Sequence, residues 1–234
     1  MNSTYAARGA GIQWACVMAL AMAWLCAALT LPAQAQSARA APAAQPAHAK
    51  SVLVLGDSLS AAYGLAASQG WVALTGARVG KTHPGWRVVN ASISGETTAG
   101  GAARITGELQ RVRPKVVVIA LGANDGLRGL PLAQARANLA SALTAIRGAG
   151  AHALLVGIEL PVNYGPQYRD GLRAMYRGLA EEFNVPLVPF LLEGVALDPD
   201  LMQDDGLHPK AEGEPKVLDN VWPVLDPALA KLKD

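Results

Sequence analysis

Short apolar runs alternate with longer amphipathic stretches along most of this chain. The runs are rich in β-branched residues and nearly continuous in apolar character, which favours strands that are covered on both faces of a sheet. The stretches between them predict helices, and Pro114 marks the end of one of these. The predicted strands cover residues 51–55, 87–89 leading into Ala91, 115–121, 153–158 and 185–189, and the predicted helices cover 69–80, 98–111, 131–148, 166–183 and 210–232.

This alternation of strand and helix predicts a parallel sheet with right-handed crossovers and helices on both faces. We therefore expect an α/β fold over residues 51–234, in the form of a single three-layer, doubly wound domain with a five-stranded sheet. No internal repeat or second domain is visible. Ligands of such sheets bind outside the carboxyl ends of the strands, so the loops that follow the strands are the places to look for chemistry.

The first 35 residues have a different character from the rest. No charged residue occurs between Ile12 and Leu31, and Ala33-Gln34-Ala35 follows as a small-x-small cleavage pattern. These features predict a secretory signal peptide over residues 1–35 that is cleaved after Ala35, and hence a periplasmic or secreted protein. An uncleaved membrane anchor is the alternative, because about twenty apolar residues can span a bilayer.

Composition and charge limit the kinds of site and partner that the chain can have. Residues 36–50 are rich in Ala, Pro and Gln without periodicity, which predicts a flexible linker. Both cysteines, Cys16 and Cys26, lie in the predicted signal peptide, so the mature chain would have no disulfide, thiol nucleophile or cysteine-based metal site. The formal net charge of +2 gives no electrostatic case for nucleic acid. We expect a monomer with no stable membrane span after cleavage.

The first candidate for chemistry is Gly56-Asp57-Ser58-Leu59-Ser60, directly after the first predicted strand. A serine at the carboxyl end of a strand can present its hydroxyl to a substrate, and Gly56 permits a tight turn beside it. A serine that merely caps a helix would look the same. The G-x-S-x-G elbow of the α/β-hydrolases is absent. This motif alone therefore leaves both interpretations open.

A second candidate lies near the C-terminus, where Asp205 precedes His208 by three residues. A carboxylate so placed can fix the imidazole tautomer and stabilise the imidazolium that forms when histidine accepts a proton. Pro209 disfavours helical geometry at His208, which favours a loop position. The alternative is an Asp/Gly turn with a surface histidine.

Two more polar segments follow the second and third predicted strands. The first offers the backbone N–H of Gly95, and the second offers the side-chain amide of Asn124. The negative oxygen of a tetrahedral intermediate needs preorganised donors of this kind. Each segment alone could be an ordinary strand exit. Together, the four loops supply a nucleophile, a base, an orienting acid and oxyanion donors.

The blocks Gly56-Asp57-Ser58, Gly95, Gly122-Ala123-Asn124-Asp125 and Asp205-x-x-His208 resemble, in order, the four blocks of the SGNH (GDSL) hydrolases. The likeness extends from Val52 to about Val224 and is closest to the periplasmic thioesterase I, arylesterase and lysophospholipase subgroup. That subgroup has similar GDSLS, NDGLRG, LPxNYG and MQDDGxHP segments. Two loop residues differ from the usual pattern, Glu96 replacing Asp and Ala123 replacing Gly.

The resemblance implies a flavodoxin-like fold and a role for each block residue. Ser58 would be the nucleophile, His208 the base and Asp205 its partner. The oxyanion hole would consist of the Ser58 N–H, the Gly95 N–H and the Asn124 side chain. No metal ion or cofactor is implied.

The resemblance also implies a groove for the acyl part of the substrate. The segment after Asn124 would move on ligand binding and line this groove, and a second wall would come from the segment after the fourth strand. The residues expected to bind substrate are Asp125, Gly126, Leu127, Leu130, Asn163 and Tyr164.

These expectations describe an exported serine esterase that hydrolyses acyl esters or thioesters of small molecules or lipids through an acyl-serine intermediate. One alternative is a carbohydrate acetyl esterase of the same fold, which the low aromatic content of 5% disfavours. Another is a non-catalytic lipid-binding module, against which the intact set of functional groups argues. The fold alone would not decide between them.

Overall fold

The computed structural model describes residues 50–232. The predicted signal peptide and nearly all of the predicted linker lie outside these residues. Lys50, the last residue of the predicted linker, is the first residue of a strand. Over residues 50–232, no helix combines the length and the apolar character that crossing a membrane requires.

Five parallel strands form one sheet in the order β2-β1-β3-β4-β5. This is the flavodoxin-like order of a doubly wound sheet, and it confirms the predicted fold class. In the register of the sheet, Leu53 of β1 pairs with Val89 on one side and with Val117 on the other. The strands are β1 (Lys50–Gly56), β2 (Trp86–Asn90), β3 (Val116–Ala120), β4 (His152–Val156) and β5 (Leu187–Val188).

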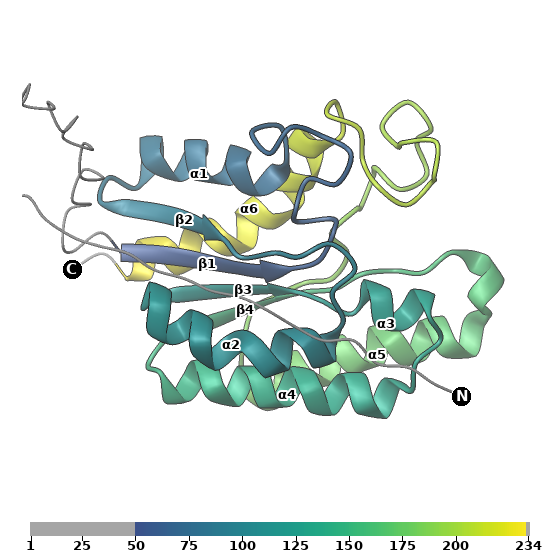
Figure 1. The fold of residues 1–234 in the computed structure, drawn as a ribbon, viewed down its shortest axis with the longest axis horizontal. Coiled ribbons are helices and arrows are strands. Elements are labelled where there is room, and N and C mark those ends of the chain that lie inside the picture. Colours follow the sequence, from purple (N-terminus) through teal and green to yellow (C-terminus); the bar gives the residue numbers. More distant parts are fainter. Residues whose placement is uncertain (1–49, 233–234) are drawn as a thin grey trace, which may run out of the picture. The chain divides into compact units, whose positions relative to one another are not determined.

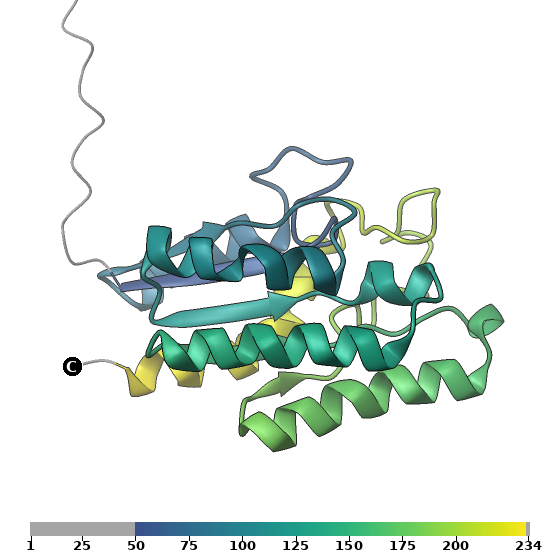
Figure 2. The same ribbon diagram turned by 60° about the horizontal axis from the view of Figure 1, so that its bottom comes forward.

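Helices cover both faces of the sheet, which gives the three predicted layers. Helices α1 (Trp71–Thr82) and α6 (Glu214–Lys231) pack together on one face (Figure 1). Helices α2 (Thr98–Val112), α4 (Leu132–Gly148) and α5 (Pro166–Phe183) lie side by side on the other (Figure 2). All five residues of β3 are buried between these layers, which explains their uninterrupted apolar sequence.

Two predicted elements are shorter than expected. The last strand is reduced to Leu187–Val188, between Pro186 and Pro189, which cannot donate backbone hydrogen bonds to a neighbouring strand. The last helix begins at Glu214 rather than at residue 210. An isolated antiparallel bridge between Met202 and Pro209 holds the preceding residues in a loop.

Two short helical elements were not predicted. They are α3 (Ala123–Leu127) and the 3₁₀ helix η1 (Val162–Tyr164), and each lies in a loop that follows a strand. The strands all point the same way, so their following loops gather at one edge of the sheet, on the right of Figure 1. The candidate residues of the sequence analysis lie on these loops.

Candidate active site

The nucleophile candidate lies in a tight turn at the end of β1. Asp57 begins this turn: its carbonyl accepts hydrogen bonds from the N–H groups of Ser60 and Ala61 at 3.1 and 2.9 Å. Its Oδ1 accepts another from the Leu59 N–H at 3.1 Å. A Cβ atom on Gly56 would lie 2.6 Å from the Ser60 Oγ, so the turn requires glycine there. Ser58 remains half-buried at the edge of the sheet.

The histidine candidate lies in a loop that its own acid organises. Asp205 Oδ1 accepts hydrogen bonds from the backbone N–H groups of Leu207 and His208 at 2.9 and 3.0 Å. The other carboxylate oxygen, Oδ2, lies 2.7 Å from His208 Nδ1. The Gln203 N–H donates to the His208 carbonyl at 2.8 Å and closes the loop. The backbone and the imidazole ring of His208 are thus oriented by one carboxylate.

Ser58, His208 and Asp205 form a continuous hydrogen-bonded chain, although Ser58 and His208 are 150 residues apart in sequence. His208 Nε2 lies 2.8 Å from Ser58 Oγ. Because an ionised Asp205 only accepts hydrogen bonds, His208 Nδ1 carries the proton and Nε2 is free to accept the serine hydroxyl. This is the geometry that lets a histidine remove a proton from a serine nucleophile.

The charge state of Asp205 supports this tautomer. Desolvation raises the pKa of the Asp205 carboxyl, but hydrogen bonds from the Leu207 N–H and from the His208 side chain and N–H outweigh it. The pKa of Asp205 is therefore held below its usual range, and the carboxylate stays ionised at neutral pH.

Asn124 reaches the same region from α3. Its Nδ2 donates to the Glu96 carbonyl at 3.0 Å and to Asp57 Oδ2 at 3.3 Å. The first bond ties the exit of β3 to the loop after β2, and the second ties it to the serine turn. The longer bond to Asp57 is the one with which an oxyanion would most readily compete, because a hydrogen bond weakens as it lengthens.

The two backbone donors that the sequence analysis named are Ser58 N–H and Gly95 N–H. Within residues 50–232, neither of them donates a hydrogen bond. Gly95 has a φ of +79°, a conformation that a side chain disfavours. The carbonyl of Gly95 accepts from Arg128 Nη2 at 3.0 Å, which fixes this peptide against α3's C-terminal end.

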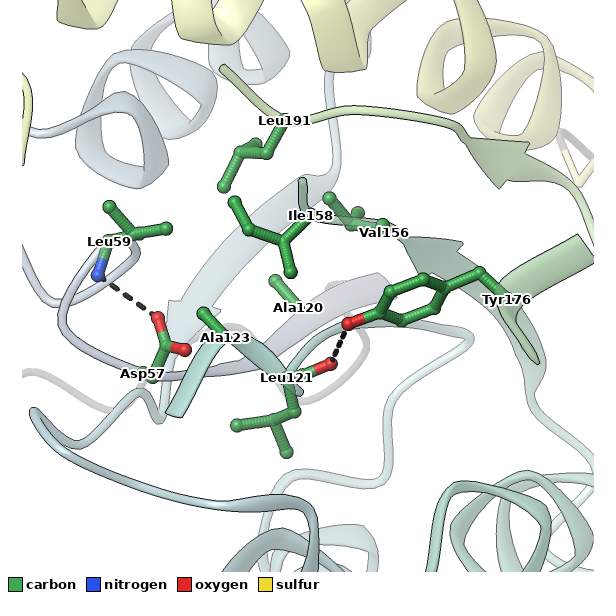
Figure 3. A pocket seen from close by; sticks show the side chains of 10 residues that line it. Asp57, Leu59, Ala120, Leu121, Ala123, Val156, Ile158, Tyr176 and Leu191 are labelled. Atoms are coloured by element: carbon green, nitrogen blue, oxygen red, sulfur yellow. Dashed lines mark hydrogen bonds between the residues drawn. The ribbon is translucent and has the colours of Figure 1, made fainter. Parts of the chain in front are cut away.

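Asp57 is buried directly behind the serine, with 1% of its surface exposed. It faces a small cavity of about 10 Å³, with Tyr176 on the opposite side (Figure 3). Such a volume holds about one water molecule at most, so bulk solvent does not reach the carboxyl. Burial raises the pKa of Asp57 to about 7, although hydrogen bonds from Leu59 and Asn124 act in the opposite direction.

The chain beside Asn124 is shaped around Tyr176. The Tyr176 hydroxyl donates to the Leu121 carbonyl at 2.9 Å (Figure 3). Gly122 follows with a φ of +120°, and a Cβ atom there would lie 2.2 Å from the Tyr176 hydroxyl oxygen. Only glycine fits this close approach, which sets the direction in which α3 and Asn124 leave the sheet.

A cavity of about 530 Å³ opens beside Ser58 and His208. Its wall is mainly aliphatic, and Asn124 lines it together with Ser58 and His208. The loops after β1, β3, β4 and β5 all contribute to it. The residues that line it are Ser58, Leu59, Ala123, Asn124, Leu127, Ile158, Glu159, Leu160, Pro161, Val162, Arg169, Phe190, Leu192, Ala196, Leu197, Met202, Gly206, Leu207 and His208.

Of the six residues expected to bind substrate, only Leu127 lines this cavity. Asp125 lies behind it, 2% exposed, and accepts hydrogen bonds from the Thr98 N–H and hydroxyl at 2.8 and 2.6 Å. Gly126 is buried against Leu160. The remaining three residues, Leu130, Asn163 and Tyr164, are not among the lining residues.

The residues that line the cavity therefore differ in part from the groove walls that the resemblance implied. Helical winding of α3 turns Asp125 and Gly126 inward, whereas the resemblance implied that this whole segment lines the groove. Tyr164 instead holds the wall in place, because its hydroxyl donates to the Leu127 carbonyl at 2.9 Å. Tyr168 does the same for the Leu130 carbonyl at 2.7 Å. In the second wall, Pro161 and Val162 line the cavity in place of Asn163 and Tyr164.

Sequence reasoning missed two residues that support His208. The ring of Tyr63 packs against the His208 ring, with 4.5 Å between their centroids. Gln203 Nε2 donates to the Tyr63 carbonyl at 2.9 Å and to the Pro209 carbonyl at 2.8 Å. Gln203 belongs to the MQDDGxHP segment that the resemblance already singled out, whereas nothing in the local sequence distinguishes Tyr63.

Comparison with known proteins agrees with this geometry. A family model described as the GDSL-like Lipase/Acylhydrolase family matches residues 54–214, a span that contains Ser58, Gly95, Asn124, Asp205 and His208. Esterase TesA from Pseudomonas aeruginosa is 51% identical over 185 residues, which cover 79% of this chain and 92% of that protein. Thioesterase 1/protease 1/lysophospholipase L1 from Escherichia coli (strain K12) is 44% identical over 179 residues, covering 76% and 85%.

Comparison with solved structures indicates the same family. The crystal structure of TesA superposes with a TM-score of 0.75 and 50% identity, covering 76% of this chain and 99% of that one. Taken together with the family match, this similarity confirms the family that the sequence motifs indicated. The chain belongs to the GDSL-like lipase/acylhydrolase family and is a hydrolase of ester bonds.

Proposed function

We propose that this protein is an exported serine esterase that cleaves acyl esters or thioesters through an acyl-serine intermediate. The observation that carries the proposal is the hydrogen-bonded chain from Asp205 through His208 to Ser58, which ends at a mainly aliphatic cavity. Export rests on the sequence of residues 1–35.

In the acylation step, the Ser58 Oγ attacks the carbonyl carbon of the ester while its proton passes to His208 Nε2. The carbonyl oxygen becomes an oxyanion, which accepts hydrogen bonds from the N–H groups of Ser58 and Gly95 and from Asn124 Nδ2. The imidazolium of His208 then protonates the departing alcohol or thiol, and the acyl group remains on Ser58. Asp205 stabilises the imidazolium throughout.

Deacylation repeats these steps with water. His208 Nε2 removes a proton from a water molecule, whose oxygen attacks the acyl-serine carbonyl. Collapse of the second tetrahedral intermediate returns the proton to Ser58 Oγ and releases the carboxylic acid. No metal ion or cofactor is needed in either step.

The cavity supports an acyl chain as the group that lies beside the nucleophile. Its aliphatic side chains would remove the chain from water, a gain of about 25 cal/mol per Å² of apolar surface. Phe190 is the single aromatic carbon ring among the lining residues. A sugar-binding site would be expected to offer more aromatic platforms, so the cavity favours acyl esters over acetylated carbohydrate.

A hydrolysis panel tests this proposal. It would contain 4-nitrophenyl esters of increasing chain length, an acyl-CoA, a lysophospholipid and an acetylated sugar, each assayed with the wild-type protein and with Ser58→Ala. We expect medium-chain acyl substrates to be cleaved faster than the acetylated sugar, and only by the wild type. Preference for the acetylated sugar would contradict the assignment. For export, intact mass of the periplasmic protein should correspond to a chain that begins at Gln36.

A further inference from the structure

Two charged side chains outside the triad line the otherwise mainly aliphatic cavity. They are Glu159 and Arg169, from the loop after β4 and from the first turns of α5. Neither takes part in the proposed acyl transfer. A charge in an apolar wall is costly unless it is paired or has a partner to bind, so the pairing of each group decides what it can do.

Glu159 is already paired within the protein. Arg173 donates to both of its carboxylate oxygens, from Nε at 2.8 Å and from Nη2 at 2.6 Å. The hydrogen bond from Arg173 outweighs desolvation and lowers the pKa of the Glu159 carboxyl. Arg173 also binds Asp170 at 2.7 Å, at the surface of the protein. Glu159 is therefore an ionised group whose bonding capacity is largely used.

Arg169 is only partly satisfied. Its Nε donates to the Leu160 carbonyl at 2.8 Å, while its Nη2 lies 3.8 Å from Glu159 Oε2, beyond hydrogen-bond distance. Within residues 50–232, neither terminal nitrogen donates a hydrogen bond, although a guanidinium carries five N–H donors. The Arg169 side chain is 22% exposed, so it is held against the wall and still reachable.

The sheet topology gives the lateral separation between the loops that carry these groups. Ser58 follows β1 and Glu159 follows β4, and β3 lies between these two strands. Neighbouring strands are about 4.8 Å apart, so the exits of β1 and β4 are roughly 10 Å apart. Leu127, from the exit of β3, lines the cavity between them. A substrate that extends across β3 from Ser58 would thus run toward Arg169, whose Nε is bonded to the Leu160 carbonyl in the loop after β4.

We propose that Arg169 is a specificity-determining residue that binds an anionic group of the substrate, a carboxylate or a phosphate, on the β4 side of the cavity. This inference rests on the proposed function, and it names a substrate class: acyl esters with a negative charge on the part that reaches the β4 side of the cavity, roughly 10 Å or more from the scissile carbonyl. The charge could stand at the end of the acyl chain or on the alcohol part of the ester. A planar guanidinium binds either anion through two parallel hydrogen bonds.

Selectivity follows from the same geometry. An anionic group pairs with the terminal N–H donors of Arg169 when it enters the cavity. A neutral chain that covers Arg169 displaces water from these donors and gives nothing in return. The preference should therefore appear as a difference between charged and neutral substrates of the same length.

Two matched pairs of substrates test the proposal and separate the two sources of charge. The first pair is mono-4-nitrophenyl suberate and 4-nitrophenyl octanoate, which differ in the terminal carboxylate. The second is octanoyl lysophosphatidic acid and monooctanoylglycerol, which differ in the phosphate. Each is assayed with the wild type, Arg169→Gln, Arg169→Lys and Arg177→Gln. Arg177 is the control because it is exposed on the same helix and does not line the cavity.

We expect Arg169→Gln to lower kcat/KM for the charged member of one pair by about 10- to 100-fold, the effect of losing a hydrogen bond to a charged group. The neutral member should not lose activity, because it makes no hydrogen bond to Arg169. A loss confined to the suberate assigns the acyl terminus, and a loss confined to lysophosphatidic acid assigns the alcohol side. Arg169→Lys keeps the charge and should retain part of the preference.

An equal effect of Arg169→Gln on charged and neutral members, or no effect on either, would overturn the proposal. If Arg169→Gln were poorly folded, Arg169→Lys would decide the matter: a weaker preference for the charged member than in the wild type would support the proposal, and an unchanged preference would overturn it. Hydrolysis of 4-nitrophenyl octanoate by the wild type reports on the proposed esterase function independently. Activity on this ester without a charge-dependent effect of Arg169 would therefore reject the anion site alone.

Discussion

Asp57 Oδ2 lies 3.3 Å from Asn124 Nδ2, so the amide proposed to bind the oxyanion is in contact with a buried carboxyl group. Asn124 also donates to the Glu96 carbonyl, at 3.0 Å. These two acceptors orient the Asn124 amide plane before any substrate arrives. Preorganisation of this kind is what makes oxyanion donors effective.

Asp57→Asn should lower kcat by about 10- to 100-fold, because it replaces a charge-capable acceptor with a neutral amide that can turn its NH₂ toward Asn124. KM for the same ester should change little, since Asp57 does not line the substrate cavity. Steady-state kinetics of Asp57→Asn, Asn124→Ala and the double variant would measure this. Additive effects of the two single changes would show that Asp57 does not act through Asn124.

Substitutions of the neighbouring residues Asp204 and Asp205 test which carboxylate orients His208. Asp205→Ala removes three hydrogen bonds to the histidine loop and should reduce kcat by roughly 10³–10⁴-fold. Asp204 is exposed, and Asp204→Ala should change kcat by no more than about two-fold. The reverse result, a silent Asp205→Ala and an inactive Asp204→Ala, would move the assignment by one residue.

Leu127 and Leu130 form a matched pair for the acyl wall, because Leu127 lines the cavity and Leu130 is exposed outside it. Leu127→Ala should reduce kcat/KM for an octanoyl ester by about ten-fold relative to an acetyl ester. This factor corresponds to the loss of about 1–2 kcal/mol of apolar contact with the longer chain. Leu130→Ala should leave this ratio unchanged. If both variants treated short and long esters alike, α3 would not be the chain-binding wall.

Glu214 predicts a pH dependence of stability. Glu214 is 2% exposed, and its carboxylate accepts the Trp71 N–H at 2.7 Å, which joins the first turn of α6 to the first turn of α1. Burial raises the pKa of Glu214 from 4.5 to about 7, despite the opposing hydrogen bond from Trp71. Between these pH values the folded chain binds the proton more tightly than the unfolded chain. The stabilisation is therefore present below about pH 4.5 and lost as pH rises through 7.

Glu214→Gln removes this titration and can keep an acceptor for Trp71. Calorimetry should show a smaller fall in the free energy of unfolding between pH 5 and pH 8 for Glu214→Gln than for the wild type, by an amount on the order of 2 kcal/mol. Asp57 titrates in the same direction, so some pH dependence will remain. Glu212→Gln, which changes an exposed neighbour, is the control and should behave as the wild type. Equal slopes for all three proteins would contradict the assignment to Glu214.

The sheet could be predicted from sequence because its central strands are covered on both faces, so each of them is a separate apolar run. The positions of Ser58 and His208 followed from that topology, since parallel strands bring their following loops to one edge. Contacts between side chains that are far apart in the sequence could not be predicted. The packing of Tyr63 on His208 and the bond from Trp71 to Glu214 join residues more than 140 positions apart, with no local pattern to signal them.

The residues that line the cavity could also not be predicted fully, although they are close together in the sequence. Leu127 and Leu130 look equivalent in the sequence, and the winding of α3 places only the first of them against the cavity. Asp125 has the appearance of a loop residue beside Asn124, but its carboxylate is used to hold Thr98 at the start of α2. A five-residue helix gives too weak a periodic signal to reveal either fact.

The account depends most on Ser58 as the nucleophile, and covalent labelling tests that role directly. The wild-type protein would be incubated with a fluorophosphonate, which reacts with activated serines, and analysed by intact mass and peptide mapping. We predict a single adduct on Ser58, none in Ser58→Ala, and much slower labelling in His208→Ala because Nε2 lies 2.8 Å from the Ser58 Oγ. Labelling of Ser58→Ala at the wild-type rate, or an adduct on another serine that accompanies loss of activity, would contradict the account.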